Sequence, residues 1–286
     1  MDPWHFTGFT DAEGCFKVNI RPSKTHKIGW SVEPAFSINL HKNDKNLLLE
    51  IKDFLGGIGT IYERKSSCYC YRIIKRNELD LLIKHFDTYP LLTKKYADFQ
   101  LFKEIFIILN EDSKMTLLKL NKILNLKASL NWGLSNKLKK SFKDFEIFPQ
   151  KRIYNHSALI NSYWVSGFVS GDGCFKIFKN NDKVQLRFRI TQHTRDEILK
   201  KKLLKFLRVG KLLQKTEQKA LHIEVLSFID IKHILIPFFN KYNLLGTKHL
   251  TFLEWIKVYE LKDKGLHLSK EGKFKISLKE FKINKK

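Results

Sequence analysis

The sequence has little of several residue types, and each shortage excludes a class of protein. Only 14 glycines and 6 prolines occur in 286 residues, which argues against a fibrous or linker-rich chain. The four cysteines are too few for a disulfide framework at this length and form no CxxC pair, so we expect a reducing compartment and no structural zinc. The apolar runs are far shorter than a membrane span, and the N-terminus resembles neither a signal peptide nor a transit peptide.

Acidic residues are scarce relative to basic ones. The chain has 53 Lys and Arg against 29 Asp and Glu, which gives a formal charge of +24. Because 43% of the residues are hydrophobic, the chain can bury a core, and the charge does not indicate disorder. Self-repulsion of this size favours an anionic partner, with nucleic acid first and a membrane surface second. A membrane partner is disfavoured because the sharpest basic pattern has the period of a strand, not of an amphipathic helix.

Four sequence blocks occur twice, in the same order and at nearly constant spacing. The paired blocks are 8–17 with 167–176, 36–41 with 188–193, 59–61 with 210–212, and 89–99 with 242–252. The chain therefore contains two diverged copies of one unit. We divide it into a first copy, a helical linker and a second copy, which span residues 1–112, 113–157 and 158–286.

Each copy has the pattern of a helix, two strands, a helix, two strands and two further helices. Asp2-Pro3 has the signature of a helix start, and Gly14 that of its end. Residues 15–21 and 183–190 alternate apolar and polar side chains, which predicts strands with one buried face. This order predicts an α+β fold. In the linker, a further helix is indicated by five leucines, Leu117, Leu118, Leu124, Leu126 and Leu130.

Small residues recur at matching places on the first helix of each copy. Gly8 and Ala12 are four residues apart, as are Gly167 and Gly171. Residues at this spacing lie on one face of a helix, and small side chains there let two helix backbones approach closely. We therefore expect the two helices to pack on each other about a pseudo-twofold axis.

An acid follows each of these small-residue stripes, Glu13 in the first copy and Asp172 in the second. If the helices pair, the two carboxylates meet at helix C-termini, where the helix dipoles are also negative. They disfavour each other unless a cation lies between them, and hard oxygen ligands favour Mg2+. Beside a basic surface, the expected chemistry is metal-assisted phosphodiester hydrolysis.

The duplicated blocks resemble the LAGLIDADG motifs of homing endonucleases, in the single-chain, two-motif form. The resemblance covers nearly the whole chain, including residues 130–134, and is greatest to enzymes encoded by group I introns of fungal mitochondria. It implies two αββαββα copies related by a pseudo-twofold axis, whose four-stranded antiparallel sheets form a saddle on double-stranded DNA. It further implies a monomeric, magnesium-dependent, mitochondrial DNA endonuclease that leaves cohesive 3′ overhangs. By the same analogy, Ca2+ would permit binding with little cleavage.

The resemblance also implies roles for the residues at the end of each motif. Glu13 and Asp172 would bind metal and direct the cleavage of one strand each. The backbone carbonyls of Ala12 and Gly171 would complete the coordination.

Polar or basic residues near the scissile phosphates are a further feature of the family. Gln192 and Lys215 stand at such positions in the second copy, where the first copy has Leu40 and Arg64. Because these residues and the two acids differ, we expect the half-sites to be chemically inequivalent and to cut their strands at unequal rates.

DNA contacts are expected on the polar faces of the strands, although a solvated face would show the same alternation. A ribbon of about ten residues at roughly 3.3 Å each spans about ten base pairs, so two ribbons would read about twenty. The target should be asymmetric because the copies have diverged. The residues expected to bind DNA are Lys17, Asn19, Arg21, Ser37, Asn39, Arg72, Lys176, Lys183, Gln185, Arg187, Arg189 and Thr191.

Two other functions compete with the endonuclease. An RNA-binding intron maturase would need a basic surface but not the paired acids. A DNA-binding protein without cleavage activity predicts damage at Glu13 or Asp172, and both are intact. The acids therefore favour the endonuclease.

Overall fold

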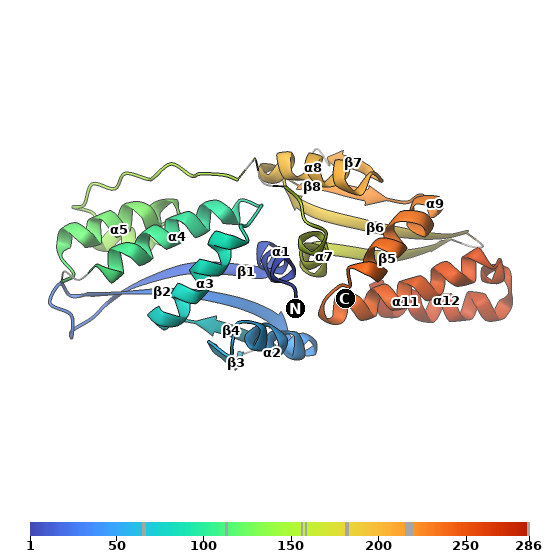
Figure 1. Ribbon diagram of the computed structural model, residues 1–286, viewed down its shortest axis with the longest axis horizontal. Coiled ribbons are helices and arrows are strands. Elements are labelled where there is room, and N and C mark those ends of the chain that lie inside the picture. The colour runs from blue at the N-terminus through green and yellow to red at the C-terminus, as the bar shows by residue number, and fades with distance from the viewer. Residues whose placement is uncertain are drawn as a thin grey trace. The chain divides into compact units, whose positions relative to one another are not determined.

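The chain has an α+β architecture with two four-stranded antiparallel sheets (Figure 1). The structure is a computed structural model that describes residues 1–64, 67–111, 114–155, 157, 159–180, 183–214 and 220–284. The fold class and the two sheets expected from the sequence are confirmed.

The first copy follows the expected order of elements. Its strands pair in the order β1-β2-β4-β3. The elements are α1 (Pro3–Glu13), β1 (Gly14–Pro22), β2 (Trp30–His41), the 3-10 turn η1 (Lys42–Asp44), α2 (Lys45–Phe54), β3 (Thr60–Arg64), β4 (Cys68–Ile73), α3 (Arg76–Thr88) and α4 (Lys95–Asn110).

The second copy repeats this order and adds helical segments after it. Its strands pair in the equivalent order β5-β6-β8-β7. The elements are α7 (Ser162–Asp172), β5 (Gly173–Asn180), β6 (Lys183–His193), η2 (Thr194–Asp196), α8 (Glu197–Leu207), β7 (Lys211–Gln214), β8 (Ala220–Val225), α9 (Phe228–Asp230), η3 (Ile231–Leu235), α10 (Ile236–Lys241), α11 (Gly246–Asp263), η4 (Leu266–Leu268) and α12 (Lys270–Asn284).

Side-chain caps start both duplicated helices. The backbone N–H of Trp4 donates to Asp2 Oδ1 at 2.8 Å, and that of Tyr163 donates to Asn161 Oδ1 at 2.8 Å. The alternating segments that follow form β1 and β6, with the apolar residues buried and the polar residues between them half-buried or exposed. The predicted start of the first helix and the predicted strand patterns are thus confirmed.

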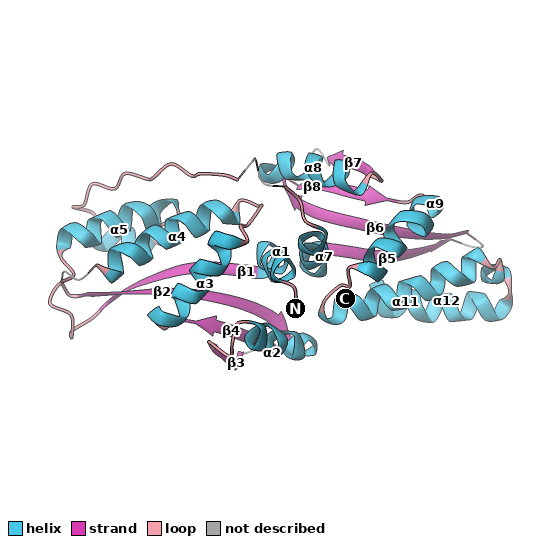
Figure 2. Cartoon of the chain, in the orientation of Figure 1, coloured by secondary structure: helices cyan, strands magenta, loops and turns pink. Residues whose placement is uncertain are grey.

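Each sheet buries its apolar face under helices through a cluster of aromatic rings. Figure 2 shows α3 and α4 on one face of the first sheet, where the Phe16 ring has four ring neighbours at 5.3 to 5.6 Å. Phe175 has four such neighbours at 5.1 to 5.9 Å in the second copy. The clusters occupy matching positions, so the duplication extends into both cores. They consist of Phe16, Phe36, Phe86, Phe99 and Phe102, and of Phe175, Phe188, Phe239, Phe252 and Trp255.

The compact units of the structure differ from the sequence copies. One unit comprises Met1–Glu13 and Leu159–Lys286, and the other comprises Gly14–Ala158. We expected divisions at 1–112, 113–157 and 158–286. The structure places α1 with the second copy because α1 packs along α7, and it places the linker with the first copy because α5 packs on α4.

The linker forms α5 (Leu117–Ser129) and α6 (Asn136–Ser141). The predicted helix is confirmed, but Leu117 and Leu118 are 56% and 69% exposed, because they lie in its first turn and not on the face that meets α4. After α5, Asn131 Nδ2 donates to the carbonyl of Phe16 at 2.6 Å, and its backbone N–H donates to Asp98 Oδ1 at 2.8 Å. These bonds tie the linker to β1 and α4.

Candidate active site

The site is built on the pairing of α1 with α7, which lie side by side in one compact unit (Figure 1). A Cβ atom on Gly8 would overlap the carbonyl oxygen of Trp164 and lie 2.9 Å from the nitrogen of Phe168. A Cβ atom on Gly167 would overlap the carbonyl oxygen of His5 and lie 3.0 Å from the nitrogen of Phe9. The contacts match residue for residue, so the pair has local pseudo-twofold symmetry. Glycine is required because the two backbones touch.

A buried polar contact also links the two helices. Trp164 Nε1 donates to Asp11 Oδ2 at 2.8 Å, and Asp11 is only 2% exposed. Ser170 occupies the matching position in the second copy. In the structure Asp11 has an interhelical role that Ser170 does not repeat, because Ser170 Oγ donates to the carbonyl of Ser166 within its own helix.

The two predicted metal-binding acids come together at the C-terminal ends of this pair. α1 ends at Glu13 and α7 ends at Asp172. A Cβ atom on Gly171 would overlap the Cβ of Ala12 and lie 3.1 Å from Glu13 Cγ and 3.2 Å from Glu13 Oε1. The Glu13 carboxylate therefore lies against the last turn of α7, next to Asp172, and the space for it exists because residue 171 has no side chain.

Polar side chains from β6 and α11 bond to Asp172 and to the residue that follows it. Gln192, at the end of β6, donates from Nε2 to Asp172 Oδ2, so the structure brings these two predicted residues together. Lys248 of α11 donates from Nζ to the carbonyl of Gly173, the residue after Asp172. We did not single out Lys248 in the sequence, although a signal was present, since Lys95 stands at the matching position of the duplicated block.

The arrangement favours a hard cation. Two carboxylates lie at the negative ends of two helix dipoles, and the carbonyls of Ala12 and Gly171 belong to the same turns. All of these donors are oxygens, which suit Mg2+ or Ca2+ better than softer metals. Within the described residues, no group of three or more His, Cys, Asp or Glu side chains could hold a metal ion. A metal here would therefore rely on the two acids together with backbone carbonyls, water or substrate oxygens.

Of the other two predicted catalytic residues, one belongs to the other compact unit and one lies outside the described residues. Arg64, on β3, belongs to the other compact unit, and its Nη1 donates to Asn39 Oδ1 at 3.1 Å. Lys215 lies outside the described residues.

On the first sheet, an acid lies among the residues expected to bind DNA. Asn19 Nδ2 donates to Glu33 Oε1 at 3.1 Å, and Arg72 Nη2 forms an ion pair with the same oxygen. Lys17 is half-buried and Arg21 is exposed on this polar face. Ser37 differs from the expectation, because its side chain is only 3% exposed, in the ladder between Cys15 and Arg72.

The second sheet repeats this arrangement with a different acid. Arg189 Nε donates to Glu224 Oε1 at 3.0 Å, and Arg187 Nη1 lies 3.6 Å from the same oxygen. The Arg187 guanidinium also lies over the Phe178 ring, 4.2 Å from its centroid. Thr191 Oγ1 and His222 Nδ1 are 2.9 Å apart. Lys183 and Gln185 are exposed and Lys176 is half-buried.

Sequence reasoning missed Glu33 and Glu224, because strand alternation does not show which residues neighbouring strands place beside a cation.

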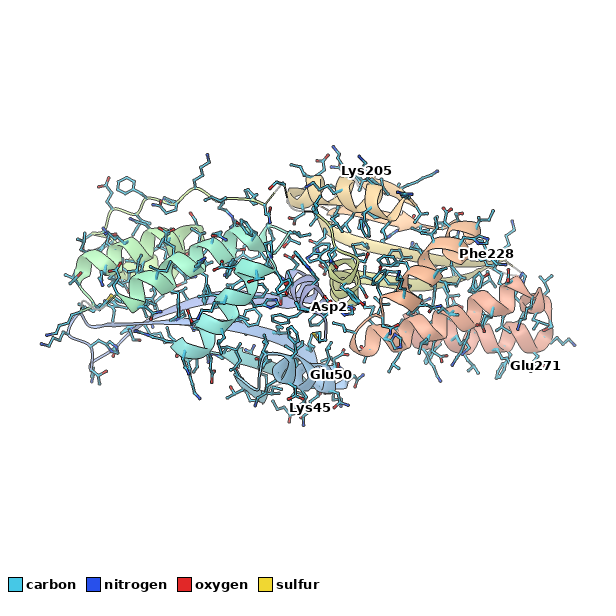
Figure 3. All side chains as sticks on the ribbon, in the orientation of Figure 1. Asp2, Lys45, Glu50, Lys205, Phe228 and Glu271 are labelled. Atoms are coloured by element: carbon cyan, nitrogen blue, oxygen red, sulfur yellow. The ribbon has the colours of Figure 1, made fainter. Side chains whose placement is uncertain are left out.

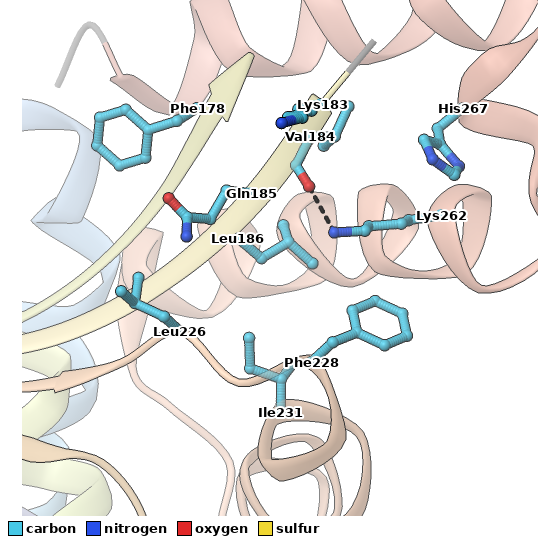
Figure 4. Close-up of a pocket in the computed structure, with 10 residues that line it drawn as sticks. All are labelled: Phe178, Lys183, Val184, Gln185, Leu186, Leu226, Phe228, Ile231, Lys262 and His267. Atoms are coloured by element: carbon cyan, nitrogen blue, oxygen red, sulfur yellow. Dashed lines mark hydrogen bonds between the residues drawn. The ribbon is translucent and has the colours of Figure 1, made fainter. Parts of the chain in front are cut away.

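A separate cavity of about 550 Å³ lies at the other end of the second sheet (Figure 4). It is lined mainly by apolar side chains such as Phe178, Leu186 and Phe228. Lys262 Nζ donates to the carbonyl of Val184 at its wall. The described residues that line it include no carboxylate, so the cavity does not resemble the site at Glu13 and Asp172.

Among the described helices, none combines the length and the apolar character needed to cross a membrane.

Comparison with known proteins agrees with this geometry. A model of the LAGLIDADG endonuclease family matches residues 6–106 and 165–259. "Probable intron-encoded endonuclease 3" of Neurospora crassa is 38% identical over 97% of this chain and 54% of its own length. "Probable intron-encoded endonuclease 2" of the same fungus is 36% identical over 96% of this chain and 64% of its own. The chain thus spans between half and two thirds of these curated relatives.

Solved structures match along the whole chain. The I-SmaMI LAGLIDADG homing endonuclease bound to cleaved DNA has a TM-score of 0.94 and 35% identity, covering 100% of this chain and 97% of its own. Another I-SmaMI structure, with uncleaved DNA target in the presence of calcium ions, has the same TM-score and covers 99% of each chain. Together with the family match over both copies, this similarity shows that the chain belongs to the LAGLIDADG endonuclease family.

Proposed function

We propose that this chain is a site-specific homing endonuclease that hydrolyses both strands of a long, asymmetric DNA target. One observation carries the proposal: the pairing of α1 with α7 brings two acids, one from each copy, to the same end of the helix pair. The DNA-bound state of I-SmaMI supports DNA as the substrate.

Magnesium is the proposed cofactor. Glu13 and Asp172 would hold it through carboxylate oxygens, with the carbonyls of Ala12 and Gly171 as further ligands, and this all-oxygen donor set fits the metal. When bound, the metal supplies a nucleophilic hydroxide and stabilises charge on the phosphate oxygens. We infer that Ca2+ supports binding with little cleavage, and the uncleaved I-SmaMI complex with calcium supports this inference.

Other side chains of the site would orient these groups. The Gln192 amide restrains the Asp172 carboxylate through the hydrogen bond from Nε2. The Lys248 ammonium, at the carbonyl after Asp172, places a positive charge where a scissile phosphate would approach. We propose that Glu13 and Asp172 direct the cleavage of one strand each and leave cohesive 3′ overhangs. We also propose that Arg64 in the first copy and Lys215 in the second act near the scissile phosphates.

The polar faces of the two sheets are the proposed DNA-binding surfaces. β2 and β6 have 12 and 11 residues, so each would follow about ten base pairs. The ion pairs to Glu33 and Glu224 would restrain the Arg72 and Arg189 side chains before DNA binds. We propose that one chain binds the whole target as a monomer. The intron-encoded relatives support a mitochondrial, group I intron origin.

A two-stage experiment tests this function. Random 30-base-pair duplexes that bind the protein in Ca2+ are enriched, and the recovered DNA is then incubated with the protein in Mg2+ or in EDTA. We expect cleavage of both strands in Mg2+ and none in EDTA. Glu13→Gln and Asp172→Asn should each retain DNA binding and lose cleavage of a different strand, by about 100-fold or more.

Full cleavage by both variants would overturn the catalytic assignment. Binding without cleavage by the native protein would favour the DNA-binding alternative. Enrichment of RNA in a parallel selection, without DNA cleavage, would favour the maturase.

A further inference from the structure

A buried lysine lies directly under the Asp172 half of the site. Lys200 of α8 has 0% exposure, whereas Lys205 of the same helix projects from its outer side (Figure 3). Lys200 Nζ donates to the carbonyl of Gln192 at 2.6 Å and also to the carbonyl of Leu221. Gln192 and Leu221 face each other across β6 and β8. The ammonium group therefore joins α8 to both strands at one level of the sheet.

Gln192 also contacts Asp172 from this position on β6. The backbone carbonyl of Gln192 accepts from Lys200, while its side-chain amide donates to Asp172. The three residues form a continuous chain of hydrogen bonds from the core to the carboxylate. A displacement of the Gln192 backbone would move the amide that restrains Asp172.

The first copy forms the same fold without these groups. α2 and α8 begin at matching positions, which places Leu48 opposite Lys200, and Leu48 also has 0% exposure. Leu40 stands opposite Gln192. The helix-to-sheet packing therefore does not require an ammonium group. Burying one is unfavourable, and desolvation lowers the pKa of Lys200 to about 8, although Asp196 and Asp172 oppose this shift. A packing role alone does not account for a lysine at this position.

We propose that Lys200 is a positioning residue for the Asp172 half-site. Its ammonium fixes the end of β6, which holds the Gln192 amide against the Asp172 carboxylate. The proposal rests on the proposed function of Asp172 and predicts that Lys200 affects the cleavage of one strand only.

The test measures single-turnover cleavage of each strand on one duplex labelled on both strands. The DNA is that recovered by the selection above, in Mg2+. Asp172→Asn should abolish the cleavage of one strand. Lys200→Met should slow the cleavage of that same strand by about tenfold or more and leave the cleavage rate of the other strand within about twofold of the native rate. Lys201→Met is the matched control, because Lys201 is the next residue of α8, carries the same charge, and pairs with Glu197 in solvent. It should change neither rate.

A double-mutant cycle tests whether Lys200 acts through Gln192. In the Gln192→Ala background, Lys200→Met should cause little further loss on the Asp172 strand. Independent, multiplicative losses would contradict the proposed path, because removing Gln192 should already uncouple Lys200 from Asp172.

The outcomes separate this proposal from the function on which it rests. If Asp172→Asn leaves cleavage intact, the proposed function fails. If Asp172→Asn abolishes the cleavage of one strand but Lys200→Met slows the cleavage of both strands equally, or of neither, the Lys200 proposal fails while the proposed function stands. Should Lys200→Met not fold, Lys200→Gln replaces it and should show the same strand selectivity with a smaller loss. If neither variant folds, Lys200 is a folding requirement and the positioning role is overturned.

Discussion

Where the backbones of α1 and α7 touch, the two copies make the same glycine contacts. Gly8 approaches the backbone of Trp164 and Phe168 just as Gly167 approaches the backbone of His5 and Phe9. At the ends of the sheets, the copies differ. The second copy has Gln192 and Lys200 at positions where the first has Leu40 and Leu48. The backbone contact that aligns the two acids is the same from both copies, while the residues at these matching sheet and helix positions differ.

The aromatic cores of the two copies also differ, but here the titratable residue is in the first copy and the apolar residue in the second. His85 of the first copy packs edge-to-face against Phe54 and Phe86, with ring centroids 5.9 and 4.9 Å away. Phe238 takes the matching place in the second copy, against Phe206 at 6.2 Å. Each copy therefore carries one titratable group at a site where the other is apolar, His85 in the first and Lys200 in the second. A duplicated fold can place such groups in one half without changing its architecture.

The largest expected effect comes from breaking what the copies share. Gly8→Ala and Gly167→Ala should each lower the free energy of unfolding by about 3 kcal/mol or more, because the added Cβ overlaps a backbone carbonyl that cannot move aside. Urea unfolding followed by circular dichroism measures this. Similar losses of stability in the two variants would confirm the local symmetry. Gly265→Ala serves for comparison: Gly265 has open space around it but a positive φ, so this variant measures the cost of backbone strain without overlap. A loss below 1 kcal/mol would contradict the contact.

A smaller effect is expected where the copies differ by one methyl group. Gly171→Ala should cost about 2 kcal/mol, because the new Cβ overlaps that of Ala12 and crowds Glu13. The double substitution Ala12→Gly with Gly171→Ala moves the methyl group to the other helix and should recover most of the loss. Thermal unfolding compares the variants. A double variant no more stable than Gly171→Ala would show that the two positions are not interchangeable.

Acid stability should distinguish the two cores. Burial lowers the pKa of His85 to about 4, while the unfolded chain keeps an ordinary value near 6.5. Between these values the unfolded chain binds more protons, so His85 lowers stability as pH falls from about 6.5 to about 4, by about 1 to 3 kcal/mol. His85→Phe copies the second core and should remove this part of the pH dependence, measured by urea unfolding at several pH values. An unchanged slope would show that His85 does not titrate in this window.

Strand-resolved cleavage should detect the divergence at the site itself. Native protein should cut the two strands at unequal rates, and Gln192→Leu, which copies Leu40, should slow the Asp172 strand by about tenfold. A timed plasmid assay that separates nicked from linear product measures both rates. Equal nicking of both strands by the native protein would contradict the expected inequivalence of the half-sites.

The smallest expected effect concerns single DNA contacts. If Arg187 neutralises one phosphate, Arg187→Ala should reduce the slope of log K against log salt concentration by about 0.9. Fluorescence anisotropy in Ca2+ at several salt concentrations measures the slope. Lys257→Ala, on α11 and paired with Glu254, is the control and should leave the slope unchanged. A native slope of only one or two would mean that most of the +24 charge does not meet phosphate.

The features predicted well from the sequence were those with local or repeated signals. The alternation in β6 and the glycine spacing of α1 and α7 each reflect contacts repeated at a fixed period. The features missed depend on the partner that a residue meets. Lys200 has the sequence appearance of a surface lysine and Ser37 that of an exposed strand residue. Glu33 lies on a different strand from the Arg72 guanidinium that it binds. Period and propensity carry no information about such long-range pairs.

The assignment of α1 to the second compact unit has a consequence for synthesis. α1 is synthesised well before its partner α7, which begins at Ser162. At about 5–20 residues per second, α1 waits roughly 8 to 30 seconds before the helix pair can form. The unit Gly14–Ala158 can meanwhile complete its own sheet, because all of its strands have already been made. Closure of the α1–α7 contact is thus a late step of folding, so a nascent chain stalled before residue 162 has neither the helix pair nor the assembled pair of acids.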